Sequence, residues 1–347
     1  MGEFTAEEAV NIANSVLDYH IKGKAIDQIV QDRLLVDQLK KNQKTFPGGK
    51  DAITVNVRGA YTTTLQGFSH DDDVGYANPA NTKQGSFNWK ELHCGIQMTH
   101  TELKHAGISV VDSSDSKSIK RHSEIDVIRI TDVFDEKIYD MMEGSAVDFH
   151  RMMWQDGSQD ASVIPGILSL ISTAPTTGFT GGIDRALNSW WRNRASMNIN
   201  AGTPANMELS RTLQREFRQL RRYKKGGKFK MYAGENFIDA LEQEARAKGS
   251  VTMTGWADKG EIDLGVADVA LKGLKVEYEP VLDDLGLTKR AYIIDHSSIC
   301  LYVMEGEEWK PHTPSRPANK YVMYRALTYT GGLVAKQLNS SGVYSIA

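Results

Sequence analysis

Residues 123–156 constrain the fold more than any other stretch of this 347-residue chain. Ser123, with Asp126 three residues later, is a typical helix start, and Gly157 is a typical helix end. Between them, apolar or small residues recur at steps of three and four, the spacing of one helical face: Val127, Ile130, Phe134, Ile138, Met141, Ser145, Phe149 and Met152. The pattern predicts one amphipathic helix, roughly 50 Å long at about 1.5 Å per residue, which is typical of an architectural element.

The composition is that of an ordinary globular protein. Forty-one basic and 44 acidic side chains give a formal net charge of −3, which argues against a dedicated nucleic-acid-binding protein with a strongly basic domain. Cys94 and Cys300 fit no metal or redox spacing, so we expect an intracellular protein without disulfides. No apolar run approaches the ~18 residues of a membrane span and no signal-peptide pattern opens the chain, so we expect no membrane association.

The hydrophobic period changes along the first hundred residues. Residues 5–41 are predicted to form two helices of an arm, which the turn-forming residues 46–49 separate from the body. Residues 53–103 alternate with period two, as strands do, around a polar loop that we place at the tip of an exposed hairpin. A short helix is predicted over residues 99–107. Because the ribbon has few aliphatic residues to bury, we expect it to lie against another subunit.

Residues 164–230 contain three further features. Residues 164–171 form a compact apolar turn, and Trp190 and Trp191 are expected in a strand that is covered on both faces. Residues 209–220 have one apolar helical face, and a basic stripe follows the other: Arg211, Arg215, Arg218, Arg222 and Lys225. This stripe could contact nucleic-acid phosphates or an acidic patch on a neighbouring copy, or it could simply be solvated.

The last third of the chain is predicted to be mostly strand. Strands are expected at residues 229–232, 274–278, 291–294 and 299–304, with one helix at residues 236–248. Residues 321–338 are expected to form a long hairpin that turns at Gly331 and Gly332. Strands with a few segregated helices favour the α+β class.

The chain offers no recognisable catalytic or metal-binding motif. His93, His100 and His105 lack zinc-ligand spacing, and the three aspartates at 71–73 lack the alternating ligands of a calcium loop. The glycine-rich stretches precede no Lys-Ser or Lys-Thr, and no Gly-x-Ser-x-Gly elbow is present. We therefore expect no enzyme and no cofactor, and we keep a soluble α+β enzyme with an unrecognised site as an alternative.

Two pairs of segments carry a resemblance to a known family. Gly-Gly-Ile-Asp-Arg-Ala at 181–186 leads into Asn-Ser-Trp-Trp-Arg-Asn at 188–193, and Glu-Gly-Glu-Glu-Trp-Lys at 305–310 precedes Tyr-Val-Met-Tyr-Arg at 321–325. Together with the order of the predicted elements, these segments resemble the major capsid proteins of tailed bacteriophages, which have the Hong Kong 97-like fold. The resemblance covers nearly the whole chain.

The resemblance implies five segments: an N-terminal arm (1–50), an extended loop (51–106), a peripheral domain (107–200) with its spine helix (123–156), an axial domain (201–305) and a return to the peripheral domain (306–347). It implies assembly into pentamers and hexamers of an icosahedral virion capsid around double-stranded DNA, in the cytoplasm of a bacterial host. Scaffolding, portal and decoration proteins would be further partners. An encapsulin-like compartment shell is the nearest alternative.

The candidate site residues are therefore interface residues, taken from the ribbon, the aromatic segment and the basic stripe: Tyr76, Trp89, Arg185, Arg192, Arg194, Arg211, Arg215, Arg218 and Arg222. Some members of the family link subunits covalently through a loop lysine and an asparagine, with a glutamate nearby. Lys83 and Asn339 occupy comparable regions, but no acidic residue follows Asn339, so we predict a non-covalent shell without subunit ladders in SDS. We also expect Phe134→Asp to prevent shell assembly by unfolding the subunit.

Overall fold

The computed structural model describes residues 32–61, 63–78, 81–99, 101, 124–224, 226–247, 270–312 and 322–347. From residue 33 onward these residues belong to one compact unit, Arg33–Ala347. Of the predicted helix at 99–107 only Thr99, which ends a strand, and Thr101 are described, and the predicted arm before residue 32, Lys225 and the side chain of Phe134 lie outside the described residues. The described part of the predicted arm is not separate from the body, because residues 34–41 form a helix that buries Leu35 and Leu39 in the main hydrophobic core. The described chain mixes helices with sheets, which confirms the α+β class.

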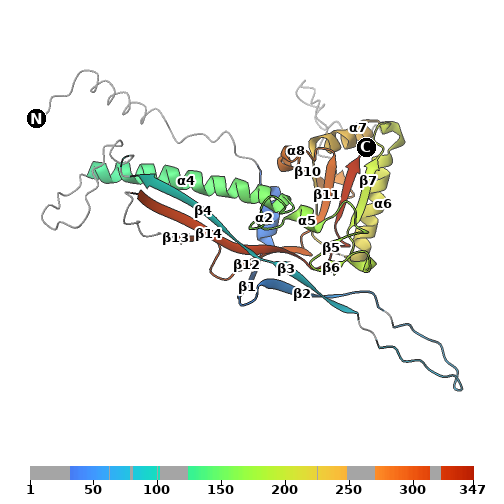
Figure 1. Cartoon of the computed structure of the whole chain (residues 1–347). Coiled ribbons are helices and arrows are strands. Elements are labelled where there is room, and N and C mark those ends of the chain that lie inside the picture. Colours follow the sequence, from blue (N-terminus) through green and yellow to red (C-terminus); the bar gives the residue numbers. More distant parts are fainter. Residues whose placement is uncertain are drawn as a thin grey trace, which may run out of the picture. The chain divides into compact units, whose positions relative to one another are not determined.

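A five-stranded sheet is organised around one long strand, β14 (Val322–Ala335). Three strands pair with β14 in the antiparallel direction: β4 (Lys90–Thr99), β12 (Ile299–Met304) and β13 (Lys310–His312). The short strand β1 (Lys44–Phe46) extends the sheet by pairing in parallel with β12. In Figure 1, β4 and β14 run side by side along the helix α4 (Glu124–Trp154).

The hairpin predicted at residues 321–338 is wrong, because β14 runs straight through Gly331 and Gly332. These glycines allow the backbone of β14 to lie close to the backbone at Tyr302 and Asn88. A Cβ on Gly331 would lie 2.7 Å from the carbonyl oxygen of Tyr302, and one on Gly332 would lie 3.1 Å from that of Asn88. A side chain at either position would force the strands apart, so the glycine pair marks tight packing instead of a turn.

The long helix predicted at residues 123–156 is confirmed, since α4 spans Glu124–Trp154. Of its predicted apolar face, Met141 and Phe149 are buried. Phe149 packs edge-on against Tyr329 of β14 and against Trp309, with ring centroids 4.9 and 5.6 Å apart. The end of α4 rests on a short helix, α5 (Ile167–Leu170), whose apolar residues are buried in the same core.

A second sheet has six strands in the order β7-β15-β11-β8-β10-β9. Its strands are β7 (Arg194–Ile199), β8 (Phe229–Ala233), β9 (Ala270–Leu271), β10 (Leu274–Tyr278), β11 (Arg290–Asp295) and β15 (Gly342–Ile346). Three α-helices accompany it: α6 (Glu208–Tyr223), α7 (Glu235–Ala247) and α8 (Pro280–Asp284). The apolar face predicted for the first of these helices is confirmed, with Leu209, Leu213, Phe217 and Leu220 all buried.

Alternate residues of the six-stranded sheet enter two different hydrophobic cores. Met231 and Ile293 lie in a core with α6 and α7, whereas Tyr232 and Tyr292 lie in the core that contains α8 and the end of α4. Trp154 at the end of α4 packs on both tyrosines, with ring centroids 5.6 and 5.5 Å away. Because neighbouring residues of a strand point to opposite faces, α6 and α8 cover opposite faces of this sheet.

Of the ribbon expected over residues 53–103, residues 52–88 form a two-stranded extension in which β2 (Ala52–Arg58) pairs antiparallel with β3 (Thr82–Asn88), whereas β4 belongs to the five-stranded sheet. The paired tryptophans correct another prediction, because they lie in a 3₁₀ turn, η1 (Ser189–Trp191), and not in a strand. Trp191 is buried and its indole N–H donates to the carbonyl oxygen of Thr180, 3.0 Å away. The remaining short elements are α2 (Leu34–Lys41), β5 (Phe179–Thr180), β6 (Ile183–Asp184) and η2 (Pro204–Asn206).

The two sheets do not coincide with the predicted segments, because each sheet contains strands from more than one segment. The strand β12, within residues 201–305, lies in the five-stranded sheet, whereas β7 and β15, from residues 107–200 and 306–347, lie in the six-stranded sheet. The division into arm, extended loop, peripheral and axial domains therefore stays a prediction.

Candidate assembly interface

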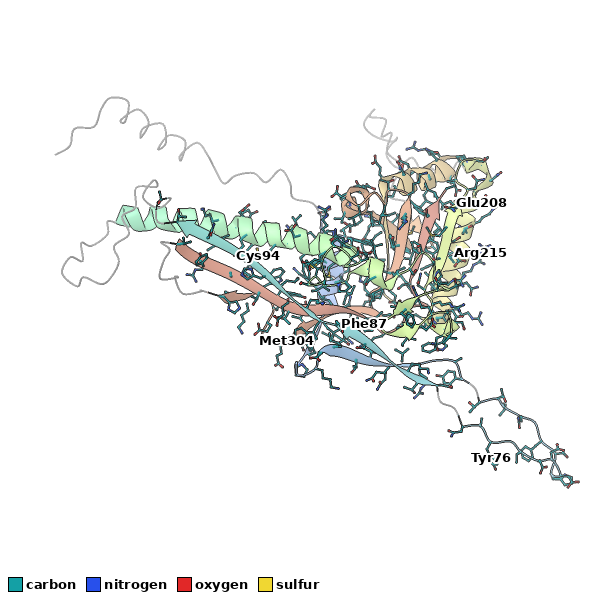
Figure 2. The ribbon with its side chains drawn as sticks, in the orientation of Figure 1. Tyr76, Phe87, Cys94, Glu208, Arg215 and Met304 are labelled. Atoms are coloured by element: carbon teal, nitrogen blue, oxygen red, sulfur yellow. The ribbon has the colours of Figure 1, made fainter. Side chains whose placement is uncertain are left out.

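The tip of the ribbon exposes large apolar side chains to solvent. Between β2 and β3, Tyr61 is 79% exposed, Phe68 70% and Tyr76 95%, and Leu65 is fully exposed. Figure 2 shows Tyr76 far out along this loop. A local turn at the tip is closed by Asp72, whose carboxylate accepts from the backbone N–H of Ser69 at 2.8 Å. The tip is therefore an apolar surface beside the exposed aspartates 71–73.

The base of the ribbon is attached firmly to the body. The ring of Phe87 is buried against Gly181, where an added Cβ would lie 2.6 Å from a ring carbon. The indole of Trp89 donates to the carbonyl oxygen of Lys50 at 2.7 Å and is half-buried. Of the two predicted ribbon residues, only Tyr76 is thus free for a partner.

Two predicted interface arginines hold a turn within the subunit. Arg185 is buried and donates to the carbonyl oxygen of Gly178 at 3.4 Å, and burial lowers the pKa of its guanidinium. The guanidinium of Arg192 donates to the carbonyl oxygens of Arg185 and Ala186 at 2.6 and 2.7 Å. These contacts shape the turn that leads into β7.

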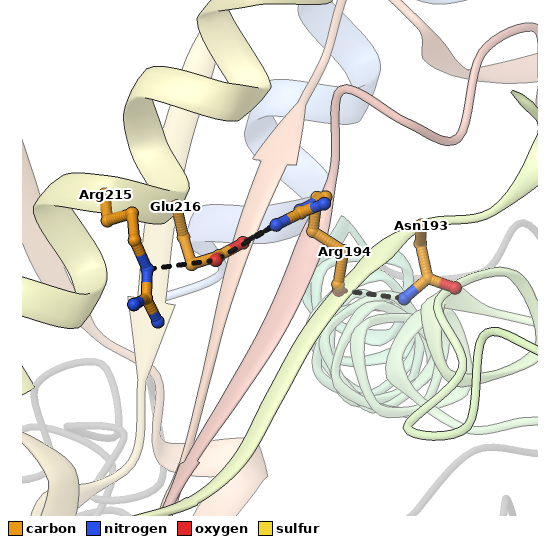
Figure 3. A network of polar contacts seen from close by, with 4 residues as sticks. All are labelled: Asn193, Arg194, Arg215 and Glu216. Carbon is orange, nitrogen blue, oxygen red and sulfur yellow. Dashed lines mark hydrogen bonds and ion pairs between the residues drawn. The ribbon is translucent and has the colours of Figure 1, made fainter.

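Arg194 connects the six-stranded sheet to the helix α6. Its guanidinium makes a two-pronged contact with the carboxylate of Glu216, at 2.8 and 3.0 Å (Figure 3). Glu216 is buried, and its hydrogen bonds raise the pKa of Arg194 above the usual value. The Nε of Arg215 lies 3.8 Å from the same carboxylate, at the exposed side of the helix. Arg194 thus has a structural partner, whereas Arg215 is only weakly engaged.

The other arginines of the stripe point away from the subunit. Arg211, Arg218 and Arg222 are exposed on α6, and the residues that the structure describes supply no carboxylate within ion-pair distance of them. Figure 2 shows the side chains of α6 around Arg215 projecting outward from the sheet. Of the nine candidate residues, the structure thus leaves Tyr76 and four arginines of α6 exposed, whereas Trp89, Arg185, Arg192 and Arg194 make contacts within the subunit.

The sequence analysis missed four buried acids, the first of which is Asp295 of β11, whose carboxylate accepts from the backbone N–H of Lys228 at 3.0 Å. Glu244 of α7 accepts from the backbone N–H groups of Leu209 and Ser210 at 2.9 and 2.8 Å, and so caps the start of α6. Glu279 lies 2.7 Å from His150 of α4, with both side chains buried. Glu216, the partner of Arg194, is the fourth. Periodicity arguments assign charged residues to the solvent, so only their partners in space could have identified them.

His296 provides a pH-dependent contribution to stability. Its Nε2 lies 2.9 Å from the hydroxyl of Tyr232, and burial lowers its pKa to about 4 from the ordinary 6.5. Between these values the unfolded chain binds a proton that the folded chain does not. We therefore expect unfolding free energy to fall by about 3 kcal/mol as the pH drops from 6.5 to 4. Denaturant titrations should show a smaller loss in His296→Gln; an equal loss in both proteins would refute the assignment.

The two residues in the regions where some family members form a cross-link are Lys83 and Asn339. Lys83 is exposed on β3, and the side-chain oxygen of Asn339 accepts from the amide of Gln337 at 2.7 Å. The described residues contain no group of three or more histidine, cysteine, aspartate or glutamate side chains placed to hold a metal ion. Cys94 and Cys300 are free thiols. Among the described helices, none has the length and apolar character needed to cross a bilayer.

Comparisons with known proteins agree on the fold. No protein-family model and no curated protein sequence matches the chain. The capsid asymmetric unit of cyanophage A-1(L) is similar with a TM-score of 0.63 at 13% identity, over 96% of this chain and 98% of that one. The capsid of cyanophage P-SCSP1u gives 0.56 at 9% identity, over 94% and 91%. The mature capsid of bacteriophage PhiM1 gives 0.52 at 10% identity, over 94% and 90%.

The chain therefore has the fold of tailed-phage capsid proteins. The likeness extends over almost the full length of both partners in each comparison, so it includes both sheets and the long helix. The resemblance found in the sequence is confirmed at the level of fold. At these identities the comparisons describe architecture, and the role of the protein has to be argued from its surfaces.

Proposed function

We propose that this protein is the major capsid protein of a tailed bacteriophage. In this proposal it assembles into pentamers and hexamers of an icosahedral shell that encloses double-stranded DNA. The observation that carries the proposal is the ribbon tip, where Tyr61, Leu65, Phe68 and Tyr76 are exposed on a long two-stranded extension. The capsid fold supports the same role.

On an isolated subunit, the apolar side chains of the ribbon tip stay exposed to water, which is unfavourable. A two-stranded ribbon is marginally stable by itself, and burying one large apolar side chain is worth about 1.5–3 kcal/mol. Four such side chains gathered at one tip form a surface that a neighbouring copy would cover. The contact lets each subunit hold the next, as a closed shell requires.

The further partners follow from the same role. We propose that scaffolding, portal and decoration proteins act with the shell, and that it forms in the cytoplasm of a bacterial host and then belongs to the virion capsid. The five-stranded sheet with α4 would form the peripheral domain. The six-stranded sheet with α6, α7 and α8 would form the axial domain around each pentamer or hexamer.

Electron microscopy of the expressed full-length chain, with and without a co-expressed scaffold, tests the proposal. We expect closed particles from the natural sequence. The variant Phe68→Ser with Tyr76→Ser should remain a folded subunit but form few particles, because the exposed tip loses its apolar area. Monomers or small closed oligomers of the natural sequence under every condition would contradict the proposal. Closed shells that package a protein cargo and no nucleic acid would instead indicate an encapsulin-like compartment.

A further inference from the structure

The outward face of α6 forms a basic patch, which we define as Arg211, Arg215, Arg218, Arg222 and Tyr223. All five side chains are exposed, and the guanidinium of Arg222 lies 5.8 Å from the centroid of the Tyr223 ring. Within ion-pair distance of these arginines, the described residues place one carboxylate, that of Glu216, which Arg194 already engages from the other side. The patch therefore has unused hydrogen-bond donors and one exposed aromatic ring.

A second surface of the same subunit is acidic. We define the acidic patch as Glu235, Asp239, Tyr278, Asp283 and Asp284, from the start of α7, the end of β10 and α8. The backbone N–H of Glu235 donates to the carboxylate of Asp283 at 3.1 Å, and Asp239 follows Glu235 by one helical turn.

The carboxylates of the acidic patch surround an exposed tyrosine. A hydrogen bond to Asp283, then burial and the charges of Asp283, Glu235 and Asp284, raise the pKa of Tyr278 to about 12. Two basic residues follow nearby in the chain. Lys289 donates to the backbone oxygen of Ala347 at 3.0 Å, and Arg290 is half-buried, so the acids still outnumber the exposed cations.

Among the described residues, no arginine of the basic patch forms an ion pair with a carboxylate of the acidic patch. The helix α7, which carries Glu235 and Asp239, shares the core of α6, so the two faces of the sheet separate the basic patch only from the carboxylates of α8. The apolar side of α6 packs with Met231 and Ile293, whereas α8 packs with Tyr232 and Tyr292 on the opposite face of the six-stranded sheet. In Figure 1, α6 and α8 accordingly lie on different sides of β11. A surface that is complementary to a different surface of the same molecule pairs copies head to tail, and such contacts form a ring when the rotation from copy to copy closes.

We propose that the basic patch of one subunit docks on the acidic patch of the next copy, head to tail, so that the six-stranded sheets form a ring. The inference rests on the proposed function and names its contact surface. The charges are opposite, and guanidinium groups pair with carboxylates in two-pronged contacts. Tyr223 and Tyr278, 50% and 47% exposed, are the two large exposed apolar side chains on the described part of this sheet and its helices, one in each patch. Tyrosine and arginine are enriched in interfaces.

Charge favours a second copy over nucleic acid as the partner. The helix α6 carries five arginines and two glutamates, whereas the whole chain has a net charge of −3, so the rest of the chain is acidic. A basic patch on an otherwise acidic molecule finds its complement on another copy.

Charge reversal on both surfaces tests the proposal. Arg211→Glu with Arg218→Glu should reduce the share of subunits in particles about tenfold, because like charges then face each other across the contact. Asp239→Arg with Asp284→Arg should do the same. The chain that carries all four changes should recover particles, since opposite charges meet again. Lys40→Glu with Lys41→Glu, on exposed positions of α2, is the control with an equal change of charge.

The readouts are sedimentation and electron microscopy at about 0.1 M salt, where exposed charges interact over about 10 Å. The thermal unfolding temperature of the soluble subunits should stay unchanged. Failure of the natural sequence to form particles would refute the proposed function itself. Normal particles from the Arg211→Glu and Arg218→Glu variant, or no recovery in the chain with four changes, would overturn only the docking proposal. Normal particles with reduced nucleic-acid content would overturn it in favour of DNA as the partner.

Discussion

Phe149→Asp should unfold the subunit and abolish particle formation. Phe149 is 3% exposed and packs edge-on against Tyr329 and Trp309. Loss of a buried phenylalanine costs about 3–5 kcal/mol, and burying a carboxylate without a partner costs more. Since a typical domain is stable by about 5–15 kcal/mol, the sum approaches the whole stability of the fold. Circular dichroism and solubility of the expressed variant would measure the effect.

Met142→Asp is the matched control on the same helix. Met142 is 54% exposed, so we expect its substitution to change the unfolding free energy by no more than about 0.5 kcal/mol. A folded Phe149→Asp subunit with the stability of the control would show that the aromatic cluster of α4, β14 and Trp309 does not form. This pair replaces the test at Phe134, whose side chain lies outside the described residues.

Gly166→Ala should destabilise the subunit by about 3 kcal/mol, because it overpacks a backbone contact. A Cβ at Gly166 would lie 2.3 Å from the carbonyl oxygen of Met153 and 2.6 Å from that of Gln155. The N–H of Gly166 also donates to the oxygen of Gln155 at 2.8 Å, so relieving the clash would weaken this hydrogen bond. Backbone atoms cannot move aside as a flexible side chain can, and the junction of α4 with α5 would have to open. Denaturant unfolding of the soluble subunit measures the loss.

Gly144→Ala is the opposite case in the middle of α4. A Cβ at Gly144 meets nothing within 4 Å, and glycine within a helix is less favourable than alanine. We therefore expect a gain of about 0.5–1 kcal/mol. Equal effects of the two alanine substitutions would mean that the close approach at Gly166 is absent in solution.

Local pattern was sufficient for most helices and strands. The steps of three and four residues in α4 and α6, and the alternation in β2, arise from how a regular backbone presents its side chains to a core. The glycines of β14 and the tryptophans of η1 show where local pattern fails. Gly331 and Gly332 have the composition of a turn, but their role is set by Tyr302 and Asn88, which lie far away in the sequence. Trp190 and Trp191 lie in the 3₁₀ turn η1, which contacts outside the turn stabilise, such as the hydrogen bond from the indole of Trp191 to the carbonyl oxygen of Thr180.

For the candidate interface, too, sequence spacing indicated some features and three-dimensional contacts were needed for others. Sequence spacing alone indicated the basic stripe of α6 and a strand ribbon within residues 53–103, because both follow from the period along one element. It predicted a polar tip, whereas the structure shows that the tip also exposes large apolar side chains. The three-dimensional contacts were needed to show that Arg185, Arg192 and Arg194 bind acceptors of their own subunit. The arginines at 211, 215, 218 and 222 remain exposed. The reason is physical: whether a charged group binds its own subunit or a neighbour depends on which acceptors surround it in space, and sequence spacing does not record that.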